Sequence, residues 1–362
     1  MPKIKAEMLT DFVRDIFVAA GCSQDESARI GRCLVGANLA GHDSHGVTRV
    51  PRYVSWKAEG AIHADRKVKR VVDTPVLAIL DGQFGFGQST APQAVEIGLE
   101  KCKAMGLAAI GLRNSGHVGR VGEWGEMAAA AGIVSIHFVN VVGSALVAPF
   151  GAVDKRFSTA PYCIGIPLPG RDPIILDFAT SLVAEGKVLV ASQGGKKIPD
   201  DALIDLEGKM SGDPHVLYGP YDEKTPRNYR HGKGAIRAFG EHKGSGLAFM
   251  CETLGGALTG NGASLEDRPW SQGMFSIYID PKVVDPEEFF PGEMQRFIKY
   301  IKDSKRVNAD EPILIPGEPE LAKRADRRAN GISLPQETWD ALVATAREAG
   351  VDGARIQKVE IF

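Results

Sequence analysis

One short segment concentrates side chains that transfer protons and bind anions. It reads Gly41-His42-Asp43-Ser44-His45-Gly46-Val47-Thr48-Arg49, and it follows a predicted helix. Histidine is the usual proton donor near neutral pH, and arginine holds a carboxylate through paired hydrogen bonds. A carbonyl carbon that receives hydride needs a proton on its oxygen. The segment therefore suits the reduction of an acid that carries a carbonyl group.

Two other interpretations of this segment remain open from residue types alone. The polar side chains could simply cap backbone groups where the helix ends. Alternatively, His42, His45 and Asp43 could bind a metal ion for a lyase or hydrolase, although no clear further ligand lies nearby in the sequence. We predict that the chain has no metal-binding residues.

A second segment is rich in glycine and lies between a predicted strand and a predicted helix. It reads Arg113-Asn114-Ser115-Gly116-His117-Val118-Gly119-Arg120-Val121-Gly122. Glycines before a helix N-terminus form a cradle for a phosphate or another anion. The spacing is G-x-x-G-x-x-G, so the segment lacks the Rossmann fingerprint. His117 is a second candidate for acid/base work or cofactor contact, and an ordinary glycine turn is the alternative.

Two further segments could border a ligand site. Asp177 ends an apolar strand, where it suits either a helix N-cap or the edge of a pocket. Lys243 lies in Glu241-His242-Lys243-Gly244-Ser245-Gly246, at the predicted start of a helix, and could contact a phosphate there. Lysine stands two positions before Ser245, so the G-x-S-x-G motif of serine hydrolases is absent.

The composition indicates a soluble globular protein of a reducing compartment. The chain has 362 residues, enough for two or three domains, and its net charge of -2 gives no general attraction to nucleic acid or anionic membrane. Its five cysteines are scattered, as is typical of a reducing compartment, and the first residues lack a secretory signal. We expect a cytoplasmic protein without a membrane span.

The pattern of apolar residues predicts the elements that hold these segments. Helices are expected from a cap at Thr10 and from a capping box at Ser23, the latter over 25–40, and a further amphipathic segment runs through Val50, Tyr53 and Trp56. Strands are expected at 76–80, 107–112, 133–139, 162–166, 174–178 and 274–279, with helices at 90–105, 124–131, 246–258, 286–302 and 336–349. Several connections are too short for regular βαβ units, which predicts a mixed sheet. The stretch 194–241 is expected to form a long binding or lid loop.

Taken together, the segments resemble the type-2 malate/L-lactate dehydrogenase family. The matching residues, in family order, are Asp43–Gly46, Arg113–His117, Val147–Phe150, Leu176–Ser181, Lys243–Gly246 and Leu314–Glu318. Finer matches at 37–46, 136–139 and 254–258 resemble its hydroxycarboxylate dehydrogenase branch.

The resemblance implies a non-Rossmann, sulfolactate-dehydrogenase-like α/β (α+β) fold with a mixed, largely antiparallel sheet. It implies a helical domain (1–75 plus 285–362), a cofactor-binding sheet domain (76–284) and a homodimer. The implied activity is the NAD(P)-dependent interconversion of 2-oxo and 2-hydroxy acids, with NAD favoured over NADP. Some relatives instead reduce cyclic imino acids, which is the alternative within the family.

The resemblance also implies roles for individual residues. His45 is the proton donor beside Ser44, with His117 as its rival and Asp177 as a further catalytic candidate. Arg49, Tyr53 and Thr159 are the implied substrate contacts. The implied cofactor contacts are His45, Gly119, Arg120, Val121, Ile175, Leu176, Asp177, Phe178, Ala179, His242, Lys243, Gly317, Glu318, Pro319 and Glu320.

Two positions depart from the family pattern. Ala160 stands where relatives commonly carry asparagine, and Pro319 stands where the close branch has tryptophan. Substrate preferences and that cofactor contact therefore transfer poorly from relatives to this chain.

Overall fold

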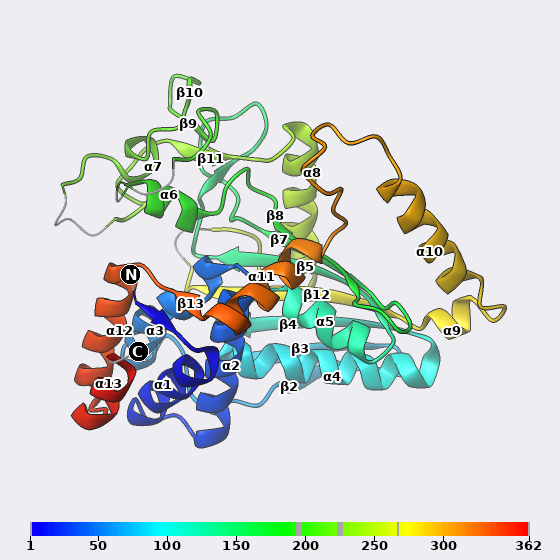
Figure 1. The fold of residues 1–362 in the computed structure, drawn as a ribbon, viewed down its shortest axis with the longest axis horizontal. Coiled ribbons are helices and arrows are strands. Elements are labelled where there is room, and N and C mark those ends of the chain that lie inside the picture. Colours follow the sequence, from blue (N-terminus) through cyan, green and yellow to red (C-terminus); the bar gives the residue numbers. More distant parts are fainter. Residues whose placement is uncertain (1, 193, 195–196, 223–226, 266–267, 361–362) are drawn as a thin grey trace.

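The structure is a computed structural model that describes residues 2–192, 194, 197–222, 227–265 and 268–360. Its largest sheet has seven strands in the order β2-β3-β4-β12-β5-β7-β8 (Figure 1). The strands are β2 (Lys69–Asp73), β3 (Leu77–Gly85), β4 (Leu107–Ser115), β12 (Ser271–Ile279), β5 (Val134–Val142), β7 (Pro161–Ile166) and β8 (Ile174–Ala179). Only the pair β3/β4 is parallel. The predicted mixed, largely antiparallel sheet is confirmed.

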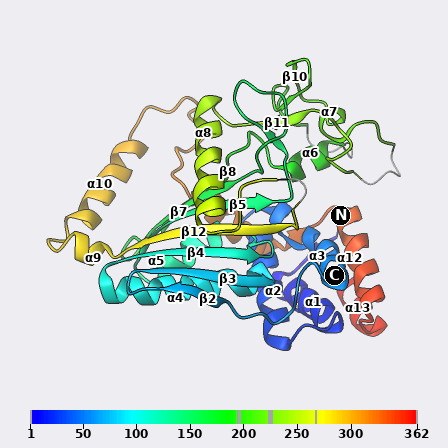
Figure 2. The ribbon, with the colours of Figure 1, turned by 180° about the vertical axis from the view of Figure 1, so that it is seen from behind.

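Helices cover both faces of this sheet. On one face, α4 (Gly87–Met105) provides the crossover that a parallel pair requires, and α5 (Gly122–Ala130) packs beside it. On the other face lies α8 (His242–Cys251), which continues as a π-helical segment, Glu252–Leu258 (Figure 2). Two neighbouring residues of β5 point to opposite faces of the sheet. Val139 joins the core under α4 and α5, whereas Phe138 packs toward α8.

The two ends of the chain share one hydrophobic core. It is built from α1 (Ala6–Ala19), α2 (Gln24–Leu39), α3 (Val50–Ala58), α12 (Gln336–Ala349) and α13 (Gly353–Glu360). A short antiparallel pair, β1 (Lys3–Ile4) with β13 (Ile332–Ser333), ties the ends together. Two further helices, α9 (Pro281–Val284) and α10 (Phe289–Lys302), lie away from this core (Figure 1). The division into a helical and a cofactor-binding domain stays a prediction.

The stretch predicted as a long loop is partly regular structure. A small sheet in the order β10-β9-β11-β6 consists of β10 (Met210–Ser211), β9 (Leu203–Ile204), β11 (Ala235–Arg237) and β6 (Val147–Ala148). Together with α6 (Glu185–Ser192) and α7 (His215–Tyr218) it encloses a hydrophobic core of its own. The strands of this small sheet are too short to show a periodic pattern, which explains why the stretch was predicted as a loop.

The helix boundaries illustrate which sequence signals are dependable. Ser23 caps α2 as predicted, because its hydroxyl accepts a hydrogen bond from the Glu26 amide at 3.2 Å. The predicted cap at Thr10 is wrong: α1 begins at Ala6, and the Thr10 hydroxyl donates back to the Ala6 carbonyl within the helix. Within the described ranges, no helix has both the length and the apolar content of a membrane span.

Candidate active site

The segment 41–49 forms two tight 3-10 turns between α2 and α3. The turns are Asp43–His45 and Val47–Arg49. Asn38, near the end of α2, holds them: its amide oxygen accepts from the Val47 amide at 2.9 Å, and its amide nitrogen donates to Asp43 at 2.6 Å. A Cβ atom at Gly46 would lie 2.2 Å from the Asn38 oxygen, so this turn requires glycine. The backbone therefore fixes where His45 points.

The two candidate proton donors lie against each other. Nδ1 of His45 is 3.2 Å from Nε2 of His117, and the ring planes differ by only 4°. The ring centroids are 5.2 Å apart, so the rings lie edge to edge, as a hydrogen bond between their nitrogens requires. Tyr53, in α3, completes the group through a hydrogen bond between its hydroxyl and Nδ1 of His117. The segment around His45 and the glycine-rich segment thus form one site.

Both histidines are held neutral by their surroundings. Burial, together with the charges of Arg49, His42 and Arg120, lowers the pKa of His45 to about 3. Burial also lowers the pKa of His117 well below its usual value, helped by His45 and Arg49. Two neutral imidazoles share one proton between their facing nitrogens, so the pair has a defined donor and acceptor order.

Arg49 provides the positive charge of the site. Its Nε donates to the carbonyl oxygen of Ser44 at 2.6 Å, which anchors the guanidinium beside the turn. After burial, its charge is a further cause of the lowered pKa of both histidines. A carboxylate bound by Arg49 would lie next to the proton donors. Ser44 packs against α6, because a Cβ added at Gly186 would lie 2.8 Å from the Ser44 Cβ.

An aromatic wall, formed by Trp56 and Trp270, borders the histidine pair. The two indole rings are 4.4 Å apart, and the Trp270 ring is 6.4 Å from that of His117. Trp56 projects from α3, while Trp270 directly precedes β12. These residues present an apolar surface beside the pair.

The three residues considered for a metal site have separate partners. His42 contacts Glu320 at 3.2 Å, and Asp43 forms an ion pair with Arg327 at 2.6 Å. Because His45 faces His117, the three side chains do not converge on one point. The part of the chain that the structure describes holds no cluster of three His, Cys, Asp or Glu side chains suited to a metal ion.

Asp177 lies near the site without touching the histidine pair. Its carboxylate accepts from the Gly122 amide at 2.7 Å, at the start of α5. Burial raises the pKa of Asp177, while the charges of His42 and Arg120 oppose that shift. Among the described residues, no hydrogen bond joins it to His45 or His117. Its catalytic role stays a prediction.

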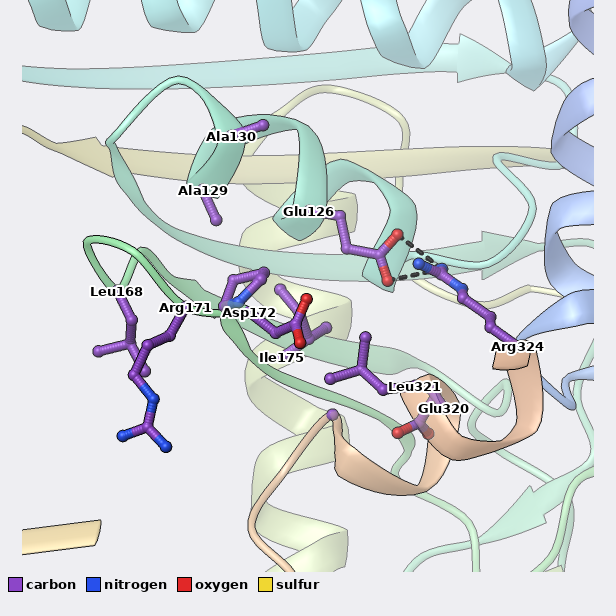
Figure 3. Close-up of a pocket in the computed structure, with 12 residues that line it drawn as sticks. Glu126, Ala129, Ala130, Leu168, Arg171, Asp172, Ile175, Glu320, Leu321 and Arg324 are labelled. Carbon is purple, nitrogen blue, oxygen red and sulfur yellow. Dashed lines mark hydrogen bonds and ion pairs between the residues drawn. The ribbon is translucent and has the colours of Figure 1, made fainter. Parts of the chain in front are cut away.

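A cavity of about 290 Å³ lies between α5, β8 and α11 (Glu318–Asn330), as Figure 3 shows. Three predicted cofactor contacts line it: Ile175, Gly317 and Glu320. The loop before α11 lies directly on β8, since the Ile175 amide donates to the Pro316 carbonyl at 3.3 Å. Glu320 also binds His42, which connects the cavity to the turn that carries His45.

Arg120 is a buried cation with unused hydrogen-bond donors. It is 2% exposed, and one guanidinium nitrogen contacts Glu126 at 2.6 Å. Its Nε and Nη1 are buried and have no partner among the described residues. Buried donors without partners are rare and indicate a ligand that satisfies them. Arg120 contacts Glu126, which lines the cavity, so this buried positive charge beside the cavity fits an anionic cofactor such as a dinucleotide.

The other predicted site residues occupy different surroundings. His242 and Lys243 begin α8 and are exposed, with the His242 ring 5.9 Å from that of Phe150. The carbonyl of Thr159 accepts from Thr180, while Ala160 is buried in a core with Ala248 and Cys251. The remaining predicted cofactor contacts lie on the segments that border the cavity or carry Arg120: Gly119, Val121, Leu176, Phe178, Ala179, Glu318 and Pro319. Their roles stay predictions.

Sequence reasoning missed several residues that build the site. Asn38, Gln88 and Trp270 gave no local signal, because a single amide or indole outside a recognisable motif predicts only packing. Glu126 and Arg324 form an ion pair of 2.7 Å across the cavity, yet they lie 198 positions apart. Only the fold brings such pairs together.

Comparison with known proteins shows the family of this chain. A family model described as malate/L-lactate dehydrogenase matches residues 4–343. Hydroxycarboxylate dehydrogenase B of Escherichia coli K12 is 37% identical over 361 residues, covering 98% of this chain and 96% of that protein.

Two solved structures share the fold. Sulfolactate dehydrogenase from Methanocaldococcus jannaschii superposes with a TM-score of 0.84 at 27% identity, covering 99% of this chain and 100% of the other. Δ1-piperideine-2-carboxylate reductase from Pseudomonas syringae gives a TM-score of 0.80 at 26% identity, covering 96% and 100%. With the family model spanning nearly the whole chain, this protein belongs to the malate/L-lactate dehydrogenase family of hydroxy acid oxidoreductases.

Proposed function

We propose that this protein interconverts 2-oxo and 2-hydroxy acids with a nicotinamide cofactor, and that His45 exchanges the proton. The observation that carries the proposal is the hydrogen-bonded pair of His45 and His117 beside the guanidinium of Arg49. That arrangement offers a proton and a carboxylate-binding group at one point. Acid/base catalysis and substrate orientation both require such proximity.

The substrate carboxylate has a second effect on the pair. Without substrate, the charge of Arg49 lowers the pKa of His45. A bound carboxylate neutralises that charge, so it raises the proton affinity of His45. In this proposal His45 gives a proton to the carbonyl oxygen of a 2-oxo acid, and it takes the hydroxyl proton back in the reverse direction. Proton supply is thus coupled to substrate binding.

The cofactor's part in the reaction is to supply or accept the hydride at the substrate carbon. Among the described residues, Arg120, Ile175, Gly317 and Glu320 would hold it, since Arg120 has unsatisfied buried donors and the others line the cavity. The subfamily resemblance favours NAD over NADP. Whether NAD or NADP binds depends on which side chain contacts the 2′ position of the adenosine ribose.

The alternative within the family is the reduction of a cyclic imino acid. The structural similarity to a piperideine carboxylate reductase favours this second candidate. An imine needs the same hydride direction and also carries a carboxylate that Arg49 would bind. The two activities therefore share the site and differ in the atom that receives the proton.

A matrix of cofactors and substrates tests the proposal. NADH and NADPH are each combined with a panel of 2-oxo acids and cyclic imino acids, and oxidation is followed by the absorbance of the reduced cofactor. We expect turnover of 2-oxo acids with NADH. Turnover of imino acids alone would favour the cyclic imino acid reductase instead. No turnover in any combination would overturn the proposed dehydrogenase activity.

We further propose a cytoplasmic homodimer. The five cysteines are free, and four of them are buried, which fits a reducing compartment. Two helices expose large apolar side chains: Phe249 and Met250 on α8 are 55% and 46% exposed, and Phe289 and Tyr300 on α10 are 68% and 66% exposed. Apolar side chains gathered on a surface indicate a protein interface. A second copy of the chain is the expected partner.

A further inference from the structure

Gln88 lies behind the histidine pair and contacts both groups that support it. It is the second residue of α4 and is completely buried. Its side-chain nitrogen lies 3.2 Å from the hydroxyl of Tyr53 and 3.2 Å from the backbone carbonyl of His117. Its side-chain oxygen is buried without a partner among the described residues. A buried polar atom without a hydrogen-bond partner destabilises the fold, so its presence calls for an explanation.

The contact with the backbone fixes which way the amide of Gln88 points. A carbonyl oxygen only accepts hydrogen bonds, so the nearby end of the amide must be the NH₂ group. The same NH₂ group therefore also donates to the hydroxyl oxygen of Tyr53. A tyrosine oxygen that accepts from Gln88 has its own hydrogen free to donate to Nδ1 of His117.

The direction of this hydrogen bond then determines the direction of the next ones. Since Nδ1 of a neutral His117 accepts from Tyr53, its proton is on Nε2, which faces His45. Nδ1 of His45 must accept that proton, so the proton of a neutral His45 is on Nε2. No described residue forms a hydrogen bond with that Nε2, which leaves it for a substrate.

We propose that Gln88 is a positioning residue that sets the tautomer of the His45–His117 pair, so that His45 presents an N–H group to the substrate oxygen. The inference rests on the proposed function for its catalytic consequence, but the tautomer itself is a property of the substrate-free protein. A carbonyl oxygen accepts a hydrogen bond from this N–H. The resting enzyme is therefore prepared to bind and orient a 2-oxo acid.

Reversing the polarity of position 88 is the sharpest test. In the variant Gln88→Glu, the side chain offers an oxygen to Tyr53 whether it is ionised or protonated. The Tyr53 hydroxyl then donates to residue 88, His117 carries its proton on Nδ1, and His45 presents a bare Nε2. The fraction of protein in the substrate-binding tautomer falls, which raises KM by about 10-fold and changes kcat less, because the competent fraction scales the apparent affinity.

The primary readout is the ring nitrogen spectrum of protein labelled with ¹⁵N-histidine. Single substitutions of His45 and His117 assign the signals. We expect the wild type to show a protonated Nε2 and an unprotonated Nδ1 on His45, and Gln88→Glu to show the opposite order. Gln88→Met keeps the volume without a donor, so it should give a mixture of both tautomers; it carries the test if Gln88→Glu does not fold.

Controls separate positioning from a general structural effect. Gln93→Glu alters another glutamine of α4, whose amide donates to the Ser89 carbonyl, and it should leave the histidine signals and KM unchanged. In a Tyr53→Phe background, Gln88→Glu should cause no further rise in KM, since the connecting hydroxyl is gone.

The outcomes distinguish this inference from the proposed function. Wild-type protein with Nδ1 of His45 protonated, or unchanged ring signals in both position-88 variants, would overturn the role of Gln88. A His45→Ala variant with full activity would overturn the proposed function, while the tautomer spectrum would still report on Gln88.

Discussion

His45 and His117 are 72 positions apart in the sequence, yet their facing ring nitrogens are 3.2 Å apart in the structure. The family resemblance left these residues as rivals for one role. The structure makes them partners, because the proton on the nitrogen between them decides what His45 presents to a substrate. Only His45 keeps a ring nitrogen that no described residue binds, and this favours it as the group that meets the substrate.

Replacing each histidine in turn separates the two roles. His45→Ala should lower kcat by roughly 10²–10⁴-fold, the usual contribution of a general acid or base. His117→Ala should lose less, since His45 remains to exchange the proton. Steady-state kinetics with the 2-oxo acid identified by the substrate matrix measures both, and cofactor binding confirms folding. The opposite order of losses would assign the proton to His117.

Arg49 is expected to act on substrate affinity. Arg49→Ala should raise KM for 2-oxo acids roughly 10- to 100-fold, the range expected for hydrogen bonds to a charged partner. Arg49→Lys should restore only part of the substrate affinity, because lysine lacks the planar pair of donors. Arg70→Ala, at an exposed ion pair on β2, is the matched control and should leave KM unchanged. An unchanged KM in Arg49→Ala would place the substrate carboxylate elsewhere.

The elements with a strong apolar pattern were predictable from the sequence. Six of the seven strands of the main sheet, and α12, appear where the pattern placed them, because each has buried positions. The edge strand β2 was not predicted, since all of its residues are exposed. In contrast, α11 was missed. None of its residues is buried, so it has no apolar stripe for a periodic pattern to reveal.

The site was predictable only in part. His45 and Arg49 are close in sequence, so residue types alone indicated proton transfer next to an anion-binding group. Gln88 was invisible for a physical reason: its role depends on two hydrogen bonds to partners 29 and 35 positions away. A lone glutamine near a helix start carries no signal of such partners.

Arg120 is expected to bind the cofactor. Arg120→Met should raise Kd for NADH by about 10-fold, because it removes charged donors that a bound dinucleotide would satisfy. Glu126 would keep Arg324 as its ion-pair partner. Calorimetric titration of NADH without substrate measures the change, with Arg355→Met, at an ion pair to Asp15, as control. Equal affinities in both variants would contradict the assignment.

Buried neutral histidines should make the protein less stable in acid. His137 is fully buried between Ser135 and Ser276, and burial lowers its pKa to about 3. Below the unfolded value of about 6.5 the unfolded chain binds a proton that the folded protein does not, so stability falls by up to about 1.4 kcal/mol per pH unit until the folded pKa is reached.

Urea unfolding at several pH values between 7.5 and 4, values chosen around the unfolded pKa of about 6.5, measures that slope. His137→Asn keeps polar groups for the two serines but does not titrate, so it should show a shallower loss of stability with falling pH. Parallel slopes for the variant and the wild type would show that His137 does not contribute. Absolute stability is not the readout, because the substitution itself costs packing.

The exposed apolar side chains of α8 and α10 should be covered by a second copy of the chain. Burial of Phe249, which is 55% exposed in the single chain, would contribute part of the association energy in proportion to its apolar area. A combined Phe249→Asp and Tyr300→Asp variant places charges in that interface and should shift the protein from dimer to monomer in sedimentation. Val307→Asp, at a fully exposed apolar side chain outside both helices, is the control and should remain dimeric. A wild type that sediments as a monomer at micromolar concentration would contradict the dimer. A doubly substituted variant that stays dimeric would move the interface to another face.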